Sequence, residues 1–319
     1  MRVMKGFTIF IVFFLMTPIS LSAAPTDYPN SPIEIIVPYA PGGGADQSLR
    51  LYKDKVSKVL GVPIIPVYKP GANAVIGMSS AKKSKPDGYT FMVVANTLIT
   101  LPPLTKRANI NFEDFDPVCS LTASPVIFCV RVDSPYKTMQ DLISAAKTKM
   151  IKIKYSSPGV LGAPHIIMAG LANEAGFEAI NIPCSGGAAA MTAVLGGHVD
   201  VSACVPTGME SQLRILACAG TERTASFPTV PTLTEIGYPG IAYDGIFCLW
   251  APKGTPKEIT SKVRAAFRKV LEENKEELMK VTSLTGSEPI VIGPEEQLER
   301  HKTLSEFFKK VIERLGIVK

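Results

Sequence analysis

The sequence predicts an α/β fold with mostly parallel sheets flanked by helices. Runs of aliphatic and β-branched residues alternate along the chain with helical patterns, as in proteins whose parallel strands are joined by crossover helices. The 319 residues are 46% hydrophobic and 19% charged. This composition excludes intrinsic disorder, and the length is enough for about two domains of 150 residues, each with its own core.

The first unit consists of a strand, a glycine-rich loop, a helix and a second strand. The predicted strand Ile33–Val37 enters the loop 38–46, which contains three consecutive glycines. A helix with apolar residues at core-facing spacings follows and ends at Gly61, before a strand over 62–67.

The same design occurs twice more. It comprises a strand over 151–155, a loop over 156–163, a helix from Pro164 to Glu174, a strand over 179–182, a loop over 183–187, a helix over 188–195 and a strand over 199–205. Three loops of small residues therefore precede three helix N-termini.

These loops predict an anion site. A helix N-terminus carries unpaired N–H groups and the positive end of the helix dipole, and glycine lets an anion approach the backbone. Tight turns alone explain one such loop, but three at equivalent strand ends favour a ligand site, because ligands in α/β sheets bind beyond the carboxyl ends of strands.

The first loop does not match the common nucleotide motifs. Gly44 is followed by Ala45 and Asp46, so neither the Gly-Lys-Ser/Thr of a P-loop nor the GxGxxG of a dinucleotide fold is present. Asp46 is interpreted as the N-cap of the helix, with a ligand contact as the alternative.

Residues 1–23 have the pattern of a secretory signal peptide. Arg2 and Lys5 precede an apolar stretch that is too short to span a membrane, and small residues lead to a predicted cleavage after Ala23. Without these two residues, 34 − 2 = 32 basic and 28 acidic residues leave a net charge of +4. The sequence has no basic stripe interleaved with aromatic residues, so nucleic acid is not an expected partner.

The cysteines and histidines do not form a metal-ligand pattern. Cys129 and Cys248 lie in apolar strand contexts, and no CxxC pair has zinc spacing, so neither a metal nor a cofactor is expected. One disulfide remains open. His198 and His301 are interpreted as surface residues, and His165 either contacts a ligand or bonds locally.

The C-terminal part is predicted to be structural. Thr255 to Glu258 has the form of a capping box, and helices with apolar stripes follow. The stripe of the last helix, which includes Phe308 and Ile312, is expected to pack on the sheet of the first domain.

Several short segments in a characteristic order extend over nearly the whole chain after residue 23. They are Ile36-Val37-Pro38-Tyr39-Ala40-Pro41-Gly42-Gly43-Gly44-Ala45-Asp46, Lys69-Pro70-Gly71-Ala72, Lys85-Pro86-Asp87-Gly88-Tyr89-Thr90, Tyr155-Ser156-Ser157-Pro158-Gly159, Ser185-Gly186-Gly187, Leu195-Gly196-Gly197-His198-Val199-Asp200, Pro228-Thr229-Val230-Pro231-Thr232 and Ala251-Pro252-Lys253-Gly254-Thr255-Pro256. In this combination the chain resembles the substrate-binding receptors of tripartite tricarboxylate transporters, the Bordetella-uptake-gene type.

The resemblance implies a two-domain periplasmic binding protein of the hinged, type II-like Venus-flytrap architecture. Domain 1 would comprise residues 24–124 and 246–319 and domain 2 residues 125–245, with crossings near Ser124 and Gly245. It also implies a monomer in the periplasm that is not an enzyme. Such a receptor binds a small organic carboxylate and delivers it to the integral-membrane permease subunits of a tripartite tricarboxylate transporter.

Carried over to this sequence, the resemblance nominates ligand-binding residues in the three loops and at two further strand ends. They are Tyr39, Gly42, Gly43, Asp46, Asn96, Thr97, Ser156, Ser157, Gly159, Gly162, His165, Cys184, Ser185, Gly186, Gly187 and Cys204.

This sequence departs from the family pattern in ways that concern the ligand. Cys184-Ser185 stands where the family commonly has Tyr-Lys, and the acidic residue that the family has near Cys204 is absent. Because a pocket without that carboxylate pairs poorly with an ammonium group, the ligand is expected to be less amine-bearing than an amino acid.

Two other functions stay open on the sequence alone. A receptor of this kind could present its ligand to a membrane sensor kinase, or a secreted hydrolase could use Cys184 or Ser185 with a histidine. The sequence disfavours the hydrolase because it contains neither GxSxG nor HExxH, and no paired carboxylates at a convincing spacing.

Overall fold

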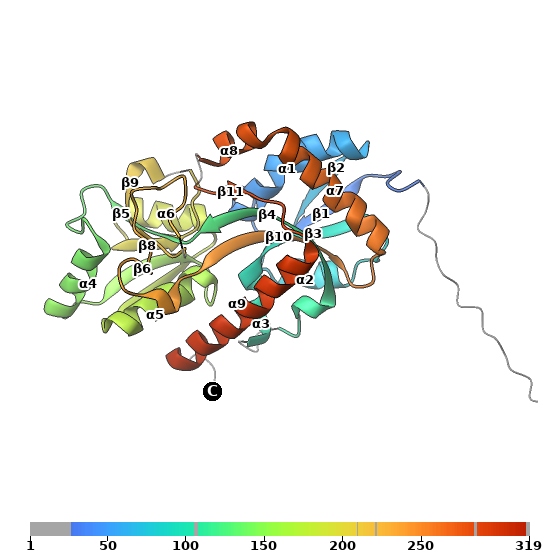
Figure 1. Cartoon of the computed structure of the whole chain (residues 1–319). Coiled ribbons are helices and arrows are strands. Elements are labelled where there is room, and N and C mark those ends of the chain that lie inside the picture. Colours follow the sequence, from blue (N-terminus) through green and yellow to red (C-terminus); the bar gives the residue numbers. More distant parts are fainter. Residues whose placement is uncertain (1–26, 105–107, 209, 221, 284–285, 317–319) are drawn as a thin grey trace, which may run out of the picture.

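The structure is a computed structural model that describes residues 27–104, 108–208, 210–220, 222–283 and 286–316. Its strands form two sheets, one in each of two lobes (Figure 1). The predicted signal peptide lies outside the described residues. Within them, no helix combines the length and apolarity needed to cross a membrane.

The first lobe is built on a six-stranded sheet. Its strands, in spatial order, are β11 (Glu288–Pro289), β4 (Phe115–Pro125), β10 (Asp244–Pro252), β3 (Thr90–Ala95), β1 (Ile33–Val37) and β2 (Ile64–Tyr68). Helices α1 (Gly44–Leu60), α7 (Lys257–Glu273) and α8 (Lys275–Ser283) pack into one apolar cluster against this sheet. Helix α2 (Val75–Lys82) packs into a second cluster, and α3 (Asn96–Leu104) follows β3.

The second lobe is built on a five-stranded sheet. Its strands, in spatial order, are β7 (Ala179–Cys184), β6 (Ile153–Pro158), β8 (Val201–Cys204), β5 (Ile127–Arg131) and β9 (Leu213–Cys218). Helices α4 (Met139–Thr148) and α5 (Ala163–Ala175) bury apolar residues in one cluster, and α6 (Gly187–Leu195) does so in another. Short 3-10 helices are η1 (Phe112–Asp114), η2 (Glu210–Gln212) and η3 (Pro239–Ile241).

The predicted α/β class is confirmed, but the sheets are mixed rather than mostly parallel. Strands joined by a crossover helix pair in parallel, as β1 does with β2 and β3, and β6 with β7 and β8. Strands β10 and β5 pair antiparallel with both of their neighbours. The antiparallel pairs involve the strands that carry the chain between the lobes and therefore enter each sheet from the opposite direction.

The chain passes between the lobes along two adjacent antiparallel strands. Strand β4 continues through Val126 into β5, and β10 returns beside it with Gly245 opposite Ser124. A Cβ atom at Gly245 would overlap the Ser124 carbonyl oxygen, so glycine permits the close approach of the two strands.

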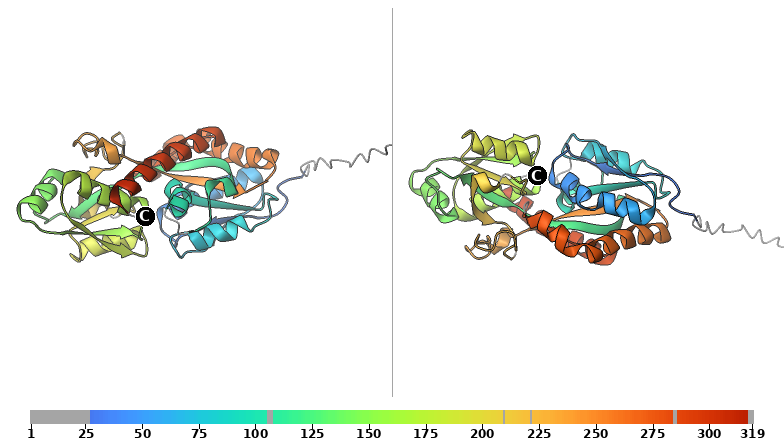
Figure 2. Two further views of the ribbon diagram at one scale, coloured as in Figure 1. Left: turned by 90° about the horizontal axis from the view of Figure 1, so that it is seen from below. Right: turned by 90° about the horizontal axis from the view of Figure 1, so that it is seen from above.

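The C-terminal helix α9 (Pro294–Leu315) extends across both lobes (Figure 2). At about 1.5 Å per residue, a helix of 22 residues is ~33 Å long, enough to reach from one lobe to the other. Phe308, Val311 and Ile312 pack into the apolar cluster of the second lobe. The expectation that this stripe packs on the first sheet is therefore wrong.

The first half of α9 is buried against the first lobe. His301 is only 1% exposed, its Nδ1 lies 2.7 Å from the carbonyl oxygen of Gln297, and its ring meets Trp250 edge to face. The prediction of a surface residue is wrong for His301 because tertiary packing turns that helix face inward. His198 is exposed, as predicted.

Two smaller expectations concern caps and cysteines. Pro256 is the N-cap of α7 and the Thr255 hydroxyl donates to the Pro252 carbonyl oxygen at 2.7 Å, so the predicted capping box is wrong. All six cysteines are described and no disulfide joins them. Cys129 and Cys248 are buried in strands, as predicted.

Candidate ligand-binding cleft

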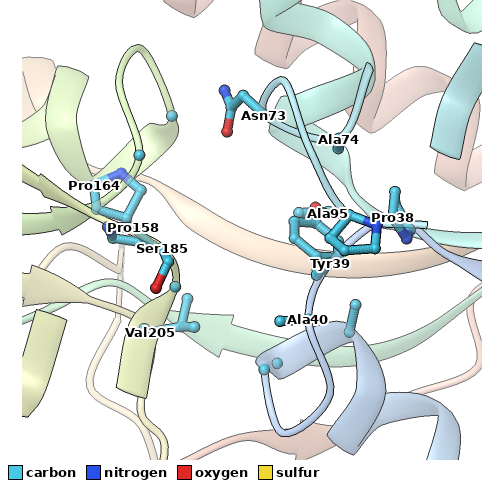
Figure 3. A pocket seen from close by; sticks show the side chains of 18 of the residues that line it. Pro38, Tyr39, Ala40, Asn73, Ala74, Ala95, Pro158, Pro164, Ser185 and Val205 are labelled. Atoms are coloured by element: carbon cyan, nitrogen blue, oxygen red, sulfur yellow. Dashed lines mark hydrogen bonds between the residues drawn. The ribbon is translucent and has the colours of Figure 1, made fainter. Parts of the chain in front are cut away.

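A cavity of about 1010 Å³ lies between the two lobes (Figure 3). Residues 38–41, 43–45 and 70–75 of the first lobe form one wall, and residues 158–160, 162–164 and 184–189 of the second lobe provide most of the other. Val126, Tyr243, Gly245 and Phe247, in and beside the two crossing strands, also line it. The cavity is thus lined by both lobes and by the segments that connect them.

Four helices begin at this cavity, two from each lobe. Their N-cap residues are Gly43 for α1, Ala74 for α2, Gly162 for α5 and Gly186 for α6, and none makes a side-chain capping bond. The first N–H groups of a helix have no partner within the helix. Val75 N of α2 donates to the Ala72 carbonyl oxygen at 3.3 Å. The other first-turn N–H groups and four positive dipole ends converge on one space.

Backbone geometry does not require glycine at three of these N-caps. Gly43 and Gly162 have φ of −78° and −85° with extended ψ, which any residue adopts. A Cβ atom would come no closer than 3.6 Å to its neighbours at Gly43 and 3.7 Å at Gly162, and would meet nothing within 4 Å at Gly186. Serine or aspartate would fit there and cap the helix. Tight turns alone thus do not explain these glycines.

Four other helices, α4, α7, α8 and α9, satisfy or neutralise their N-termini. Thr138 and Asp141 form a complete capping box on α4, and α7, α8 and α9 each carry glutamate in the first turn. By contrast, α2, α5 and α6 carry no acidic residue in the first turn. Three of the four helices that begin at the cavity therefore have no acidic side chain in the first turn to neutralise the positive end of the helix.

Asp46 in α1 is the exception, but its carboxylate is used by the protein. It accepts hydrogen bonds from Gly42 N at 2.7 Å, Tyr68 Oη at 2.8 Å and Arg50 Nε at 2.9 Å. Burial raises the pKa of Asp46, but these hydrogen bonds and the Arg50 charge outweigh it and hold the pKa below its ordinary value. The predicted N-cap is wrong, since Gly43 occupies that position; Asp46 instead fixes the loop before the helix.

The structure brings nine of the sixteen nominated residues to the cavity. They are Tyr39, Gly43, Thr97, Gly159, Gly162, Cys184, Ser185, Gly186 and Gly187. The other seven do not line it: Gly42, Asp46, Asn96, Ser156, Ser157, His165 and Cys204.

Residues in this second group support the loops from behind. His165 Nδ1 accepts a hydrogen bond from Leu161 N at 2.9 Å, and Ser156 Oγ donates to the carbonyl oxygen of Ala190 at 2.7 Å. Cys204 is buried in the apolar cluster that includes Ala190 and Met191 of α6. These residues hold the loops of the second wall in place instead of facing the cavity.

Asn96 has a similar supporting position at the crossing strands. Its Oδ1 accepts hydrogen bonds from the Tyr243 hydroxyl and from Ile246 N. Because Tyr243 and the neighbouring Phe247 line the cavity, Asn96 couples the start of α3 to the floor of the site.

Sequence reasoning missed the loop 70–75 as part of the site. It follows the second parallel strand, the same position that marked the other loops, and this was the available signal. Ala72, Asn73 and Ala74 all have positive φ, between 47° and 72°. The Asn73 side-chain amide donates to the Val160 carbonyl oxygen at 3.3 Å and joins the two walls.

The site contains no pattern typical of a metal centre or an activated nucleophile. The described residues include no cluster of three or more His, Cys, Asp or Glu that could hold a metal. Burial raises the pKa of the Cys184 thiol, which favours the protonated form. Such a thiol is a weak nucleophile.

Comparisons with known proteins agree with this architecture. The model of the tripartite tricarboxylate transporter family receptor matches residues 49–313. A protein of Cupriavidus necator, known as the UPF0065 protein in the gbd 5′ region, is 36% identical over 298 residues, covering 92% of this chain and 90% of the relative.

Solved structures of similar fold support the same conclusion. The periplasmic binding protein BugD has a TM-score of 0.82 and 26% identity, covering 91% of this chain and 99% of its own. A TctC solute binding protein from Polaromonas has a TM-score of 0.70 and 30% identity, covering 90% of this chain and 100% of its own. The two-lobed arrangement is therefore that of periplasmic binding proteins.

Proposed function

This chain belongs to the tripartite tricarboxylate transporter receptor family, and from that premise we propose that it is an exported receptor for a small carboxylate. In this proposal the ligand binds in the cleft between the lobes. The loaded receptor, acting as a monomer in the periplasm, delivers the ligand to the membrane permease subunits of a tripartite transporter.

One observation carries the proposal: four uncapped helix N-termini converge on the cavity. Backbone N–H groups there can donate hydrogen bonds to carboxylate oxygens, and the dipole ends favour negative charge. The glycine N-caps Gly43, Gly162 and Gly186 leave the backbone accessible although a capping side chain would fit. This arrangement supports binding of an anion without arginine or lysine in the site.

The hydrolase alternative receives less support from the geometry. Cys184 and Ser185 line the cavity, but His165 does not, and its Nδ1 is already hydrogen-bonded to Leu161 N. A general base has to be within hydrogen-bond reach of the nucleophile. The proposal therefore treats the protein as a receptor and not as an enzyme.

Ligand-dependent thermal stability tests the proposal. A ligand that binds only the folded protein at 100 times its Kd stabilises it by about 2.7 kcal/mol, which raises the melting temperature. Mono-, di- and tricarboxylates are compared with phosphate and neutral sugars on the protein lacking residues 1–23. A shift with at least one carboxylate is expected, whereas shifts with phosphate or sugars alone would contradict the proposal.

Uptake by cells tests delivery to a permease. A strain that lacks this protein is expected to lose uptake of the carboxylate, and uptake should return with the wild-type gene. If uptake persists while transcription of a two-component system responds to the acid, the sensing role is favoured instead.

A further inference from the structure

We infer that the ligand is an acid without an amino group whose body between or beyond its carboxylates is largely hydrocarbon. This inference rests on the proposed function and specifies the chemical class that the same cleft accepts. It follows from the side chains that line the cavity, which limit what each part of a ligand can contact.

None of the described side chains that line the cavity carries a charge at neutral pH. Among its described lining residues there is no Asp, Glu, Lys, Arg or His. Near the site, the Asp46 carboxylate is bonded to Gly42, Arg50 and Tyr68, and Lys69 Nζ donates to Ser80 Oγ at 2.6 Å. A ligand ammonium group enclosed here would lose its water without gaining a carboxylate partner, and this costs binding free energy.

The polar side chains among the described lining residues are those of Tyr39, Asn73, Thr97, Cys184, Ser185 and Tyr243. Both tyrosine hydroxyls and the Asn73 amide already have a partner. The Tyr39 hydroxyl accepts a hydrogen bond from Ala95 N at 3.2 Å, and the Tyr243 hydroxyl donates to Asn96 Oδ1. Ser185 lies on the second wall and lines the cavity (Figure 3). A ligand with many hydroxyl groups would leave several of them without hydrogen-bond partners.

Apolar side chains provide most of the remaining contacts. Val75 and Phe247 belong to the first lobe, Val160 and Val205 to the second, and Val126 lies at the crossing between them. Prolines line both walls as well, including Pro38 and Pro164, which face each other across the cavity in Figure 3. Such a surface gains free energy from burying hydrocarbon.

The cavity also offers space for more than a short acid. Ligand pockets typically have volumes of about 300 to 1,000 Å³, and this one is at the upper end at about 1010 Å³. Helix N-termini on both walls can donate hydrogen bonds to the ligand carboxylates. The space between the walls is available to the rest of the ligand. The backbone thus recognises the charged carboxylates, and apolar side chains recognise the rest of the ligand.

Matched pairs of acids test this inference by calorimetry. Hexanoate, adipate and 3-phenylpropionate are each compared with their 2-amino derivatives norleucine, 2-aminoadipate and phenylalanine, and adipate is compared with its tetrahydroxy analogue galactarate. For every parent acid that binds, the amino or hydroxylated partner is expected to bind at least about 100-fold more weakly, because unpaired polar groups would be buried.

The outcomes separate this inference from the proposed function. An amino acid or galactarate that binds more tightly than its parent acid would overturn the inference and leave carboxylate binding intact. Binding of citrate or malate with no binding of the three parents would do the same. If no carboxylate binds and phosphate or sugars do, the proposed function fails together with the inference.

A change of specificity provides a second readout. Ser185 is exposed at the cavity, so Ser185→Asp is expected to fold and to place a carboxylate in the site. The preference for the parent acid over its amino derivative should then fall by about 10-fold or more. The isosteric, uncharged Ser185→Asn variant is compared with Ser185→Asp and should show the larger preference for the parent acid; equal preferences in the two variants would contradict the inference.

Discussion

The cleft and the space beneath α9 both contain polar groups that the protein itself does not pair. At the cleft these are backbone N–H groups at helix ends, which are all donors and face a cavity. Beneath α9, in the described structure, Trp250 Nε1, His301 Nε2 and both amide atoms of Gln297 are buried without a partner. An anion in the cavity can accept hydrogen bonds from the first set. The second set is buried away from any ligand, so its missing hydrogen bonds only lower the stability of the fold.

The difference shows why burial alone does not indicate a binding site. His301 Nδ1 faces a carbonyl oxygen, which only accepts, so the neutral ring carries its proton on Nδ1 and leaves Nε2 as an acceptor. Its surroundings contain donors and acceptors together and offer no single charge to a ligand. The cleft, by contrast, presents groups of one kind, and this favours an anion.

The largest expected effect is a loss of folding stability at acid pH, caused by the buried His301 of α9. Burial lowers the pKa of His301 from its ordinary value of 6.5 to about 4. Between these values the unfolded state binds more protons, so stability falls as the pH decreases from 6.5 toward 4. The loss from this group is about 3 kcal/mol at pH 4, measured by denaturant unfolding across pH.

Variants at two histidines show whether this pH dependence of stability comes from His301. His301→Leu, which fills the site without a titrating group, is expected to lose the additional pH dependence. His198→Gln changes an exposed histidine and should keep it. The same slope of stability against pH in wild type and His301→Leu would contradict the explanation.

The next largest effect follows from giving a cavity helix its own cap. Gly186→Asp places a capping carboxylate on α6, where a Cβ atom meets nothing within 4 Å. The new charge occupies the N–H donors and repels an anionic ligand, so affinity should fall by about 100-fold while folding stability is maintained. Calorimetry and thermal unfolding measure the two quantities.

An uncharged cap shows how much of the lost affinity comes from competition for the N–H donors and how much from charge repulsion of the ligand. Gly186→Asn caps a helix about as well as aspartate does but adds no charge, and its affinity should lie between those of Gly186→Asp and wild type. Unchanged affinity in both variants would remove α6 from the proposed site.

A smaller effect is expected at a helix that begins away from the cleft. Thr138 caps α4 and takes part in a capping box with Asp141. Thr138→Ala should lower the free energy of unfolding by about 1 kcal/mol and leave ligand affinity unchanged. A loss of affinity at this distant helix would show that the two kinds of helix start are not independent.

The smallest effect concerns backbone strain at the edge of the cleft. Ala72 is exposed and has a φ of 47°, a conformation that costs an L-residue about 1 kcal/mol. After the entropy cost of glycine, Ala72→Gly should stabilise the protein by roughly 0.5 kcal/mol. Ala72→Val is the opposing control and should destabilise it; denaturant midpoints of the two variants decide the sign.

Local patterns in the sequence were sufficient to predict many individual elements. The strand, loop and helix around 33–60 and the helix stop at Gly61 depend on neighbouring residues, and the structure has them in place. The predicted loops before α5 and α6 are also present for the same reason. Apolar periodicity identified the buried face of α9, but not the lobe against which that face packs.

The missed and mistaken features depend on contacts between distant residues. Asp46 turns away from the cavity because Tyr68, on the next strand, approaches it. Loop 70–75 joins the site only because it faces Val160 across the cleft. His301 is buried because Trp250 of β10 lies against it.

The sequence by itself determined the α/β class and the glycine loops before helices, because turns, helix stops and apolar periodicity act over a few residues. Tertiary structure decided that four helix ends, two from each lobe, surround one cavity whose described lining contains no Asp, Glu, Lys, Arg or His. That convergence depends on the paired crossing strands and on α9, whose partners lie far away in the chain, and no local pattern specifies it.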